Sequence, residues 1–244
     1  MEKKRVIVTG GGASGLMAAI AAAENGAAVT ILEQNEKPGK KICATGNGKC
    51  NFTNIQVPSD AYRSENPGFE QAVLNQFPVE DTVKFFTRLG IYPVNKNGGY
   101  LYPHSAASVA EVLCMEARNL GVKIKTNQKV QRVFKEQDIW KVQVEGWIYE
   151  SEAVILSNGS KASAISGSDG SGYELAAALG HRLIEPLPAL TALKCRNTGF
   201  SGWAGVRTEG RITLLVDGKK VTEETGELQL TDYGVSGIPV FQVS

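Results

Sequence analysis

The sequence has neither a large excess of one charge nor a long apolar run. Its 244 residues include 26 Lys+Arg and 25 Asp+Glu, which gives a formal net charge of +1. Proteins that bind nucleic acids usually have a strongly basic face, so we expect no nucleic-acid partner. No stretch reaches the roughly 18 consecutive apolar residues that a membrane-spanning helix needs, so we expect no membrane partner.

Histidine and cysteine are also scarce, with two histidines and four cysteines. No two cysteines have the short spacing, about two to four residues, that structural zinc sites use, so we expect no metal site. Unpaired thiols are typical of a reducing compartment. The basic start of the chain is similar to a signal peptide, but the glycines from Gly10 to Gly15 interrupt its apolar part. We therefore expect a cytoplasmic protein.

Glycine, in contrast, is abundant: 27 of the 244 residues are glycine. This share of about 11% exceeds the roughly 7% of an average protein. Several of them stand in a strand–loop–helix–strand pattern. Residues 4–9 predict a buried strand, and Gly10-Gly11-Gly12-Ala13-Ser14-Gly15 follows directly. Residues 16–25 are good helix formers that Gly26 ends, and residues 27–33 predict a second strand. This order is typical of the βαβ unit of a Rossmann-like dinucleotide-binding domain, in the α/β class.

Each part of this unit has a role in dinucleotide binding. Gly10 permits the turn, Gly12 lets the backbone approach a pyrophosphate, and Gly15 lets the helix pack closely on the sheet. The helix N-terminus adds unpaired N–H groups and a partial positive charge. Glu33 has the position of the acid that binds a ribose 2′-OH, and it would repel the additional phosphate of NADP. The candidate residues are Gly10, Gly12, Ala13, Ser14, Gly15, Glu33 and Gln34. These features leave FAD and NAD both open.

The segment after this unit, residues 37–49 (KPGKKICATGNGK), contains four lysines, three glycines and no acid. We expect a basic, glycine-rich loop here rather than another helix. Such a loop can surround a phosphate or an electron-rich ring with N–H groups and ammonium charges. A solvated basic loop without a ligand is the alternative, and composition leaves both open.

The same region resembles the signature of a known family. GKKICATGNGKCNFTN (residues 39–54) is similar to the pattern G-[RK]-K-x-x-x-[ST]-G-[GN]-G-[RK]-C-N of the HI0933-like, or BaiN-like, family of bacterial two-dinucleotide-binding flavoproteins. Three further stretches resemble that family: YLYPHSAASVAEVL (100–113), SGSDGSGYELAAALGH (166–181) and GELQLTDYGVSGIPVFQVS (226–244). The resemblance therefore extends from the first strand to the last residue.

The resemblance implies FAD as the cofactor, bound by the first glycine loop, with the GNGKCN loop close to the flavin. It also implies an FAD-dependent oxidoreductase that transfers hydride between the flavin and NAD(P)H or a small-molecule substrate, with bile-acid reduction among the proposed activities. Cys50 is either a reactive thiol or a small buried side chain, and His104 is either a proton donor or a structural histidine. No catalytic residue follows. The implied flavin-side residues are Lys40, Lys41, Thr45, Gly46, Asn47, Gly48, Lys49, Cys50 and Asn51.

A later turn, at residues 157–160, departs from the family pattern. The family usually has Ala-Thr-Gly-Gly there, next to the cofactor, so the resemblance makes three residues candidate cofactor contacts: Ser157, Asn158 and Gly159. Ser160 replaces a glycine. A left-handed backbone at that position would therefore be strained.

Hydrophobic periodicity and turn residues predict the remaining elements. Helices are expected at residues 67–77, 79–89, 105–120 and 173–179, and a hairpin at residues 92–102. Short strands are expected at residues 122–126 and 153–156, on either side of a three-stranded antiparallel meander at residues 129–135, 139–144 and 147–150. Such a meander is a common crossover in FAD-binding domains. Its first strand would offer the Val130 backbone to adenine.

We expect two domains. Residues 1–188 form a Rossmann-like FAD/NAD(P)-binding domain, and residues 189–244 form the start of an inserted β-rich, barrel-like domain with a hairpin turn at Asp217-Gly218. The chain resembles only somewhat more than the first half of a family member, so we expect a second chain or a missing C-terminal segment. It is a fragment, half of a split protein or a decayed copy. A non-catalytic nucleotide-binding fragment and a plain NAD-dependent protein stay as alternatives to the oxidoreductase.

Overall fold

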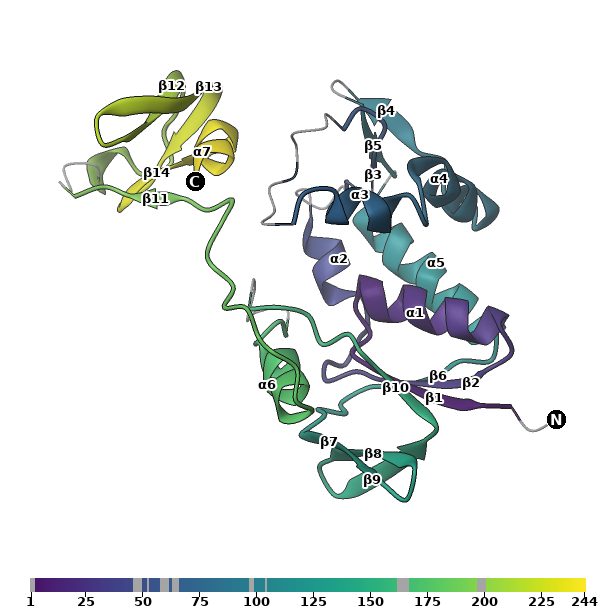
Figure 1. The fold of residues 1–244 in the computed structure, drawn as a ribbon. Coiled ribbons are helices and arrows are strands. Elements are labelled where there is room, and N and C mark those ends of the chain that lie inside the picture. Colours follow the sequence, from purple (N-terminus) through teal and green to yellow (C-terminus); the bar gives the residue numbers. More distant parts are fainter. Residues whose placement is uncertain are drawn as a thin grey trace. The chain divides into compact units, whose positions relative to one another are not determined.

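The chain forms two compact units, Met1–Leu183 and Ile184–Ser244, in a computed structural model (Figure 1). The structure describes residues 3–45, 50–51, 53–57, 62, 66–96, 99–103, 105–161, 167–196 and 201–244. In the sequence, the first unit ends at Leu183, a few residues before the expected boundary at residue 188. In the described part of the chain, no helix combines the length and the apolar character needed to cross a membrane.

The first unit is built on a parallel sheet with the strand order β10-β1-β2-β6. Its strands are β1 (Arg5–Thr9), β2 (Ala28–Leu32), β6 (Lys123–Lys125) and β10 (Ala153–Leu156). Valine, isoleucine and leucine dominate β1, β2 and β10, as in parallel sheets that are covered on both faces. The expected α/β class is therefore confirmed.

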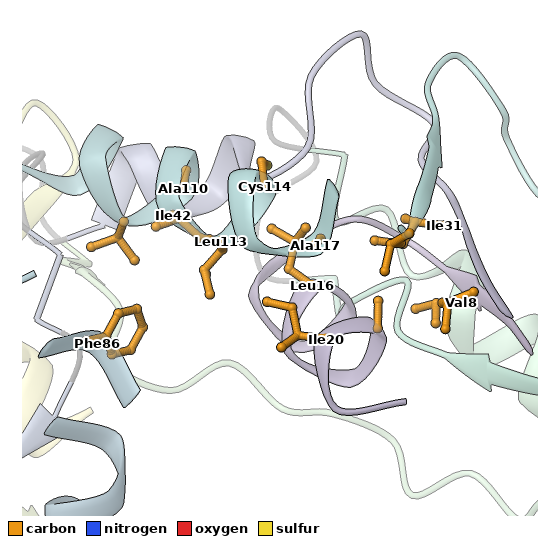
Figure 2. Packing of buried hydrophobic residues seen from close by; sticks show 14 of the residues in the cluster. Val8, Leu16, Ile20, Ile31, Ile42, Phe86, Ala110, Leu113, Cys114 and Ala117 are labelled. Atoms are coloured by element: carbon orange, nitrogen blue, oxygen red, sulfur yellow. The ribbon is translucent and has the colours of Figure 1, made fainter. Parts of the chain in front are cut away.

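Helices cover one face of this sheet: α1 (Ala13–Glu24) and α5 (Ala106–Asn119) (Figure 1). Leu16 and Ile20 of α1 are buried with Val8 and Ile31 of the sheet in one cluster that also contains Leu113 of α5 (Figure 2). Alanines make up much of the rest of α1, and their small side chains let the helix lie close to its neighbours.

The meander covers the opposite face. It consists of β7 (Arg132–Glu136), β8 (Ile139–Val144) and β9 (Trp147–Ser151), and α6 (Ser171–Ala178) packs beside it. Because successive side chains of a strand point to opposite faces, Ile7 of β1 packs toward Val133 and Val142 while its neighbour Val8 faces the helices. The meander connects β6 to β10, so the predicted crossover is confirmed. However, β7 begins at Arg132, later than expected, and Val130 lies in the segment before it.

A smaller antiparallel sheet, two further helices and the short helix α2 (Lys40–Ala44) also belong to the first unit. The sheet contains β3 (Thr53–Asn54), β4 (Val94–Lys96) and β5 (Tyr100–Tyr102), and the helices are α3 (Phe69–Leu74) and α4 (Val79–Arg88). The predicted hairpin and the second helix are confirmed. The first helix begins later than predicted because Gly68, with a φ of 84°, turns the chain just before it, and it ends at Leu74 rather than at residue 77.

The second unit is an antiparallel sheet with the order β11-β14-β13-β12 and one helix. Its elements are β11 (Leu193–Lys194), a 3-10 helix η3 (Ser201–Trp203), β12 (Arg207–Val216), β13 (Lys219–Leu230), β14 (Gly234–Gly237) and α7 (Ile238–Val243). The predicted turn is confirmed: Asp217 and Gly218 have φ values of 51° and 77°, as a type I′ hairpin requires. The sequence pattern did not predict α7, which begins at Ile238, has Pro239 in its first turn and completely buries Val240.

Candidate functional site

A pocket of about 600 Å³ lies in the first unit, beside the carboxyl ends of β1 and β2. Ligands of open α/β sheets bind at this edge. Of the residues predicted from the sequence, the pocket wall contains Gly10, Gly12, Ala13, Ser14, Glu33, Gln34, Lys40, Lys41, Thr45, Cys50, Asn51, Val130, Ser157, Asn158 and Gly159. Gly15 is not in the wall. Four predicted residues lie outside the described part of the chain: Gly46, Asn47, Gly48 and Lys49.

The glycine loop connects β1 to α1 as the sequence predicts. Gly10 has a φ of 96°, and its N–H donates to the carbonyl of Leu32 over 2.7 Å. A Cβ on Gly15 would lie 1.9 Å from the Gly10 carbonyl oxygen, so the helix can approach the loop only because this residue is glycine. A Cβ on Gly12 would meet nothing within 4 Å, and Gly12 faces the pocket. The wall therefore leaves space at Gly12, where a pyrophosphate would need it.

The N-terminus of α1 opens toward this space. Its N-cap, Gly12, has no side chain to accept hydrogen bonds from the first turn. The N–H groups of that turn are thus left for a ligand, with the positive end of the helix dipole. The described wall contains three lysines, Lys40, Lys41 and Lys129, and one acid, Glu33. This balance favours an anionic ligand.

Glu33 is buried at the end of β2, with 6% of its surface exposed. Its Oε2 accepts a hydrogen bond from the Gly11 N–H over 2.6 Å. Its Oε1 accepts two, from the main-chain N–H and the side-chain amide of Asn35, each over 2.7 Å. The carboxylate therefore ties the end of β2 to the glycine loop while it faces the pocket.

The segment after β2 differs from the expected irregular loop. It contains a short helix, α2 (Lys40–Ala44). The sequence pattern did not predict this helix because the lysines and glycines of the segment indicated a loop. Gly39 starts it with a φ of 74°, and the Gly39 N–H donates to the Gly11 carbonyl over 2.8 Å. Ile42 anchors α2 in the core near Ala110 of α5 (Figure 2). This apolar contact stabilises the helix and places Lys40 and Lys41 in the pocket wall.

The turn after β10 forms another part of the wall. The Ser157 hydroxyl donates to the Thr9 carbonyl over 2.8 Å, and the Thr9 hydroxyl donates to Oδ1 of Asn158 over 2.6 Å. The left-handed residue of this turn is Gly159, with a φ of 83°, and Ser160 does not have a positive φ. The strain expected at Ser160 is therefore absent, because glycine occupies the position that needs it.

Gly167, Ser168 and Ser171 belong to the pocket wall, and side chains from other parts of the wall hold this segment. Lys41 Nζ lies 3.2 Å from the Ser168 hydroxyl, and Gln34 donates to the Gly167 carbonyl. Hydrogen bonds from Ser171, together with the Lys129 ammonium 3.0 Å away, lower the pKa of Asp169 to about 2. The sequence motifs identified none of these contacts.

Among the described residues, Cys50 and Cys114 are buried thiols. Burial raises the pKa of the Cys50 thiol and of the Cys114 thiol, which makes both poor nucleophiles at neutral pH. Cys50 is 7% exposed, in agreement with a small buried side chain. His181 is exposed and follows α6, and His104 lies outside the described residues. Within the described ranges, no three His, Cys, Asp or Glu residues are arranged to hold a metal ion.

Several wall residues were not predicted. Most are apolar or lie in the turns that face the glycine loop: Met17, Leu32, Asn35, Gly39, Ile42, Phe86, Val109, Leu113, Gln128, Lys129, Gly167, Ser168 and Ser171. Some had a local signal: Asn35 lies two residues after Glu33, and Gly39, Ile42, Gly167, Ser168 and Ser171 lie within stretches that resemble the family. The apolar residues of α1, α4 and α5 come to the pocket through tertiary packing.

Comparison with known proteins gives a match to the HI0933-like protein Rossmann domain over residues 4–237. The chain is 47% identical over 244 residues to the 3-dehydro-bile acid delta(4,6)-reductase of Clostridium scindens, covering 98% of this chain and 59% of that protein. It is 31% identical over 245 residues to the ribosomal RNA dihydrouridine synthase of Haemophilus influenzae, covering 98% of this chain and 60% of that protein. The chain thus spans less than two thirds of these relatives.

Among solved structures, the 3-ketosteroid-delta4-(5alpha)-dehydrogenase of Rhodococcus jostii has a similar fold. Its TM-score is 0.53 at 18% sequence identity, and the match covers 74% of this chain and 55% of that one. The family match and these relatives confirm the family that the sequence motifs indicated.

Proposed function

Because the chain belongs to the HI0933-like protein family, we propose that it holds FAD in the pocket of the first unit and serves the reduction of a carbon–carbon double bond. One observation carries the proposal: the same pocket is lined by the glycine loop and by described residues of the segment after β2, namely Lys40, Lys41, Ile42, Thr45, Cys50 and Asn51. The glycine loop and Glu33 suit the adenosine diphosphate half of a dinucleotide. The α2 side of the wall leaves room for the rest of a longer ligand.

The residues present fit FAD. The space at Gly12 and the N-terminus of α1 suit the pyrophosphate, and Glu33 is placed for the adenosine ribose. Lys40 and Lys41 add positive charge toward the other half, where the resemblance also places the GNGKCN loop. Val130, 5% exposed in the wall before β7, is our candidate for the adenine contact. Bound FAD supplies the hydride chemistry, and the chain binds, orients and shields it.

The substrate class follows from the names of the relatives. A delta(4,6)-reductase of a 3-dehydro bile acid and a dihydrouridine synthase both saturate a carbon–carbon double bond. In a keto bile acid and in a uracil ring alike, such a bond can be conjugated to a carbonyl group. We therefore propose that the substrate is an unsaturated carbonyl compound. The double bond gains a hydride and a proton, and one NAD(P)H is oxidised.

A free small molecule is our first candidate for this substrate. The formal net charge of +1 gives the chain none of the basic excess that RNA-binding proteins use to contact phosphates. The 31% identity to an rRNA-modifying enzyme keeps a uracil base within RNA as the second candidate. We also propose a cytoplasmic location, since all four cysteines are free thiols.

We propose that the first unit is the FAD-binding domain and that the second belongs to an inserted β-rich domain. The relatives contain a further region that this chain does not cover. That region can contribute to their activity. Assays should therefore use the chain alone and the chain together with the additional region of a relative.

The first experiment is the absorption spectrum of the purified chain with added FAD, followed by titration of FAD. We expect flavin binding, and Glu33→Ala should weaken it roughly ten- to hundred-fold, because a hydrogen bond to a charged partner is lost. Glu36→Ala, which removes an exposed acid nearby in the sequence, is the matched control and should bind normally. If the chain binds NAD but not FAD, the proposal is overturned in favour of an NAD-dependent protein.

The second experiment offers NAD(P)H with a 3-keto-4,6-diene steroid or with a uracil-containing RNA, and follows loss of the double bond by mass spectrometry. Reduction of the steroid supports the first candidate. Reduction of the RNA alone would replace it with the second. Binding of FAD without reduction of either would leave a nucleotide-binding component that needs a partner chain.

A further inference from the structure

Asn35 lies next to the candidate ribose site but has no role in the function proposed above. Its main-chain N–H and its side-chain Nδ2 both donate to Oε1 of Glu33, each over 2.7 Å. Both residues are in the wall of the pocket. Two N–H groups of Asn35 thus donate to one carboxylate oxygen of Glu33, which lies in the pocket wall.

The backbone holds both residues in place. The Glu33 N–H donates to the Lys125 carbonyl over 2.9 Å, and the Glu33 carbonyl accepts from the Gln128 N–H over 2.8 Å. The Asn35 carbonyl accepts from the N–H of Asn127, which has a φ of 56°. One turn after β6 therefore fixes the main chains of Glu33 and Asn35, and the geometry of their contact does not depend on a mobile side chain alone.

The acceptor positions of the carboxylate are nearly used up. An ionised carboxylate has about four lone-pair positions, two on each oxygen. Asn35 takes two on Oε1, and the Gly11 N–H takes one on Oε2 over 2.6 Å. The contacts of the described residues thus leave about one position, on Oε2. A carboxylate in this arrangement accepts one ribose hydroxyl rather than two.

We propose that Asn35 is a positioning residue that makes Glu33 a single acceptor, selective for the ribose 2′-OH. This inference rests on the proposed nucleotide site and names the contact within it. The 2′-OH is the group that an acid at this position binds in dinucleotide folds. With Oε1 occupied by Asn35, the Glu33 carboxylate keeps no second acceptor position for the 3′-OH. Asn35 thereby sets which hydroxyl the site recognises, without contacting the reacting atoms.

The test is calorimetric titration of the whole chain with ADP, 2′-deoxy-ADP and 3′-deoxy-ADP. For the unaltered chain we expect 2′-deoxy-ADP to bind roughly ten- to hundred-fold more weakly than ADP. We expect 3′-deoxy-ADP to bind within about threefold of ADP. Equal losses for the two analogues would overturn the inference, because the carboxylate would then accept both hydroxyls. This comparison uses only the unaltered chain, so a variant that does not fold cannot affect the result.

Asn35→Ala tests the residue itself. It removes the Nδ2 donor, returns one acceptor position to Oε1 and loosens the carboxylate, so the affinities for the two deoxy analogues should come within about threefold of each other. A merely structural residue would lower all three affinities together and leave their ratios unchanged, and that result would overturn the inference. Asn25→Ala is the matched control: the Asn25 amide donates to the Ala21 carbonyl over 2.8 Å at the end of α1 and lies outside the pocket wall. Its ratios should equal those of the unaltered chain.

The same data separate this inference from the proposed function. If ADP binds but the affinities for the two deoxy analogues differ from the expected ratios, Asn35 does not have the assigned role, and the nucleotide site is still supported. If neither ADP nor FAD binds, the site itself is wrong, and the inference falls with it.

Discussion

Two glycines of the same loop should respond differently to the same small substitution. In Gly15→Ala, the new Cβ would lie 1.9 Å from the Gly10 carbonyl oxygen and 2.7 Å from the Ser157 hydroxyl. The backbone of the loop must therefore move, and overpacking of this kind costs about 1–3 kcal/mol or more. In Gly12→Ala, the new Cβ meets nothing within 4 Å, and the φ of −75° suits alanine. The cost is about 1 kcal/mol, because alanine is a poorer N-cap than glycine.

Thermal unfolding and ADP titration distinguish the two effects. One kcal/mol corresponds to a change in Tm of about 2–4 °C for a unit of this size. Gly15→Ala should therefore lower the Tm by roughly 6–12 °C for a cost of about 3 kcal/mol. Gly12→Ala should change the Tm by less than about 4 °C but weaken ADP binding at least about tenfold, since its methyl group enters the space for the pyrophosphate.

The two results have separate consequences. Normal ADP binding by Gly12→Ala would mean that the loop serves packing alone and that the nucleotide lies elsewhere. An unchanged Tm for Gly15→Ala would mean that α1 does not lie as close to β1 as the structure has it.

Further predictions concern the core and Asp169. Leu16→Ala should destabilise the first unit by about 2–5 kcal/mol in urea unfolding because Leu16 is completely buried. Met115→Ala, at a residue 64% exposed on α5, should change stability by less than about 0.5 kcal/mol. Equal unfolding midpoints of the two variants would contradict the burial of Leu16 in the core. The pKa of Asp169 is lowered from 3.8 to about 2 by Ser171 and Lys129, so its charged form stabilises the fold above about pH 4, and that contribution is lost as the pH falls toward 2. The Tm difference between the unaltered chain and Asp169→Asn should therefore shrink over this range, and a constant difference would rule out the hydrogen-bonded carboxylate.

The sequence alone determined the features that depend on a few neighbouring residues. The βαβ unit followed from β-branched strands, helix formers and the glycines between them. Ser105 caps the N-terminus of α5, since its hydroxyl accepts a hydrogen bond from the Ser108 N–H over 3.1 Å. Asp217-Gly218 forms the predicted turn because both residues tolerate a positive φ. Backbone preferences of this kind act within one turn of chain and can be recognised without a structure.

The tertiary structure alone decided the features that depend on contacts between distant segments. The lysines and glycines after β2 predicted a loop, but Ile42 reaches the core beside α5, and that apolar contact stabilises α2. The left-handed position after β10 falls on Gly159 rather than Ser160.

The carboxylate of Glu33 could be located by its spacing from the glycines, but not its partners. Gly11 lies 22 positions away in the sequence, and Asn35 is held by the turn at Asn127. Hydrogen bonds between distant segments form only once the sheet has brought β2, the glycine loop and the end of β6 together. Their geometry, and with it the number of acceptors left for a ligand, belongs to the fold and not to any one stretch of sequence.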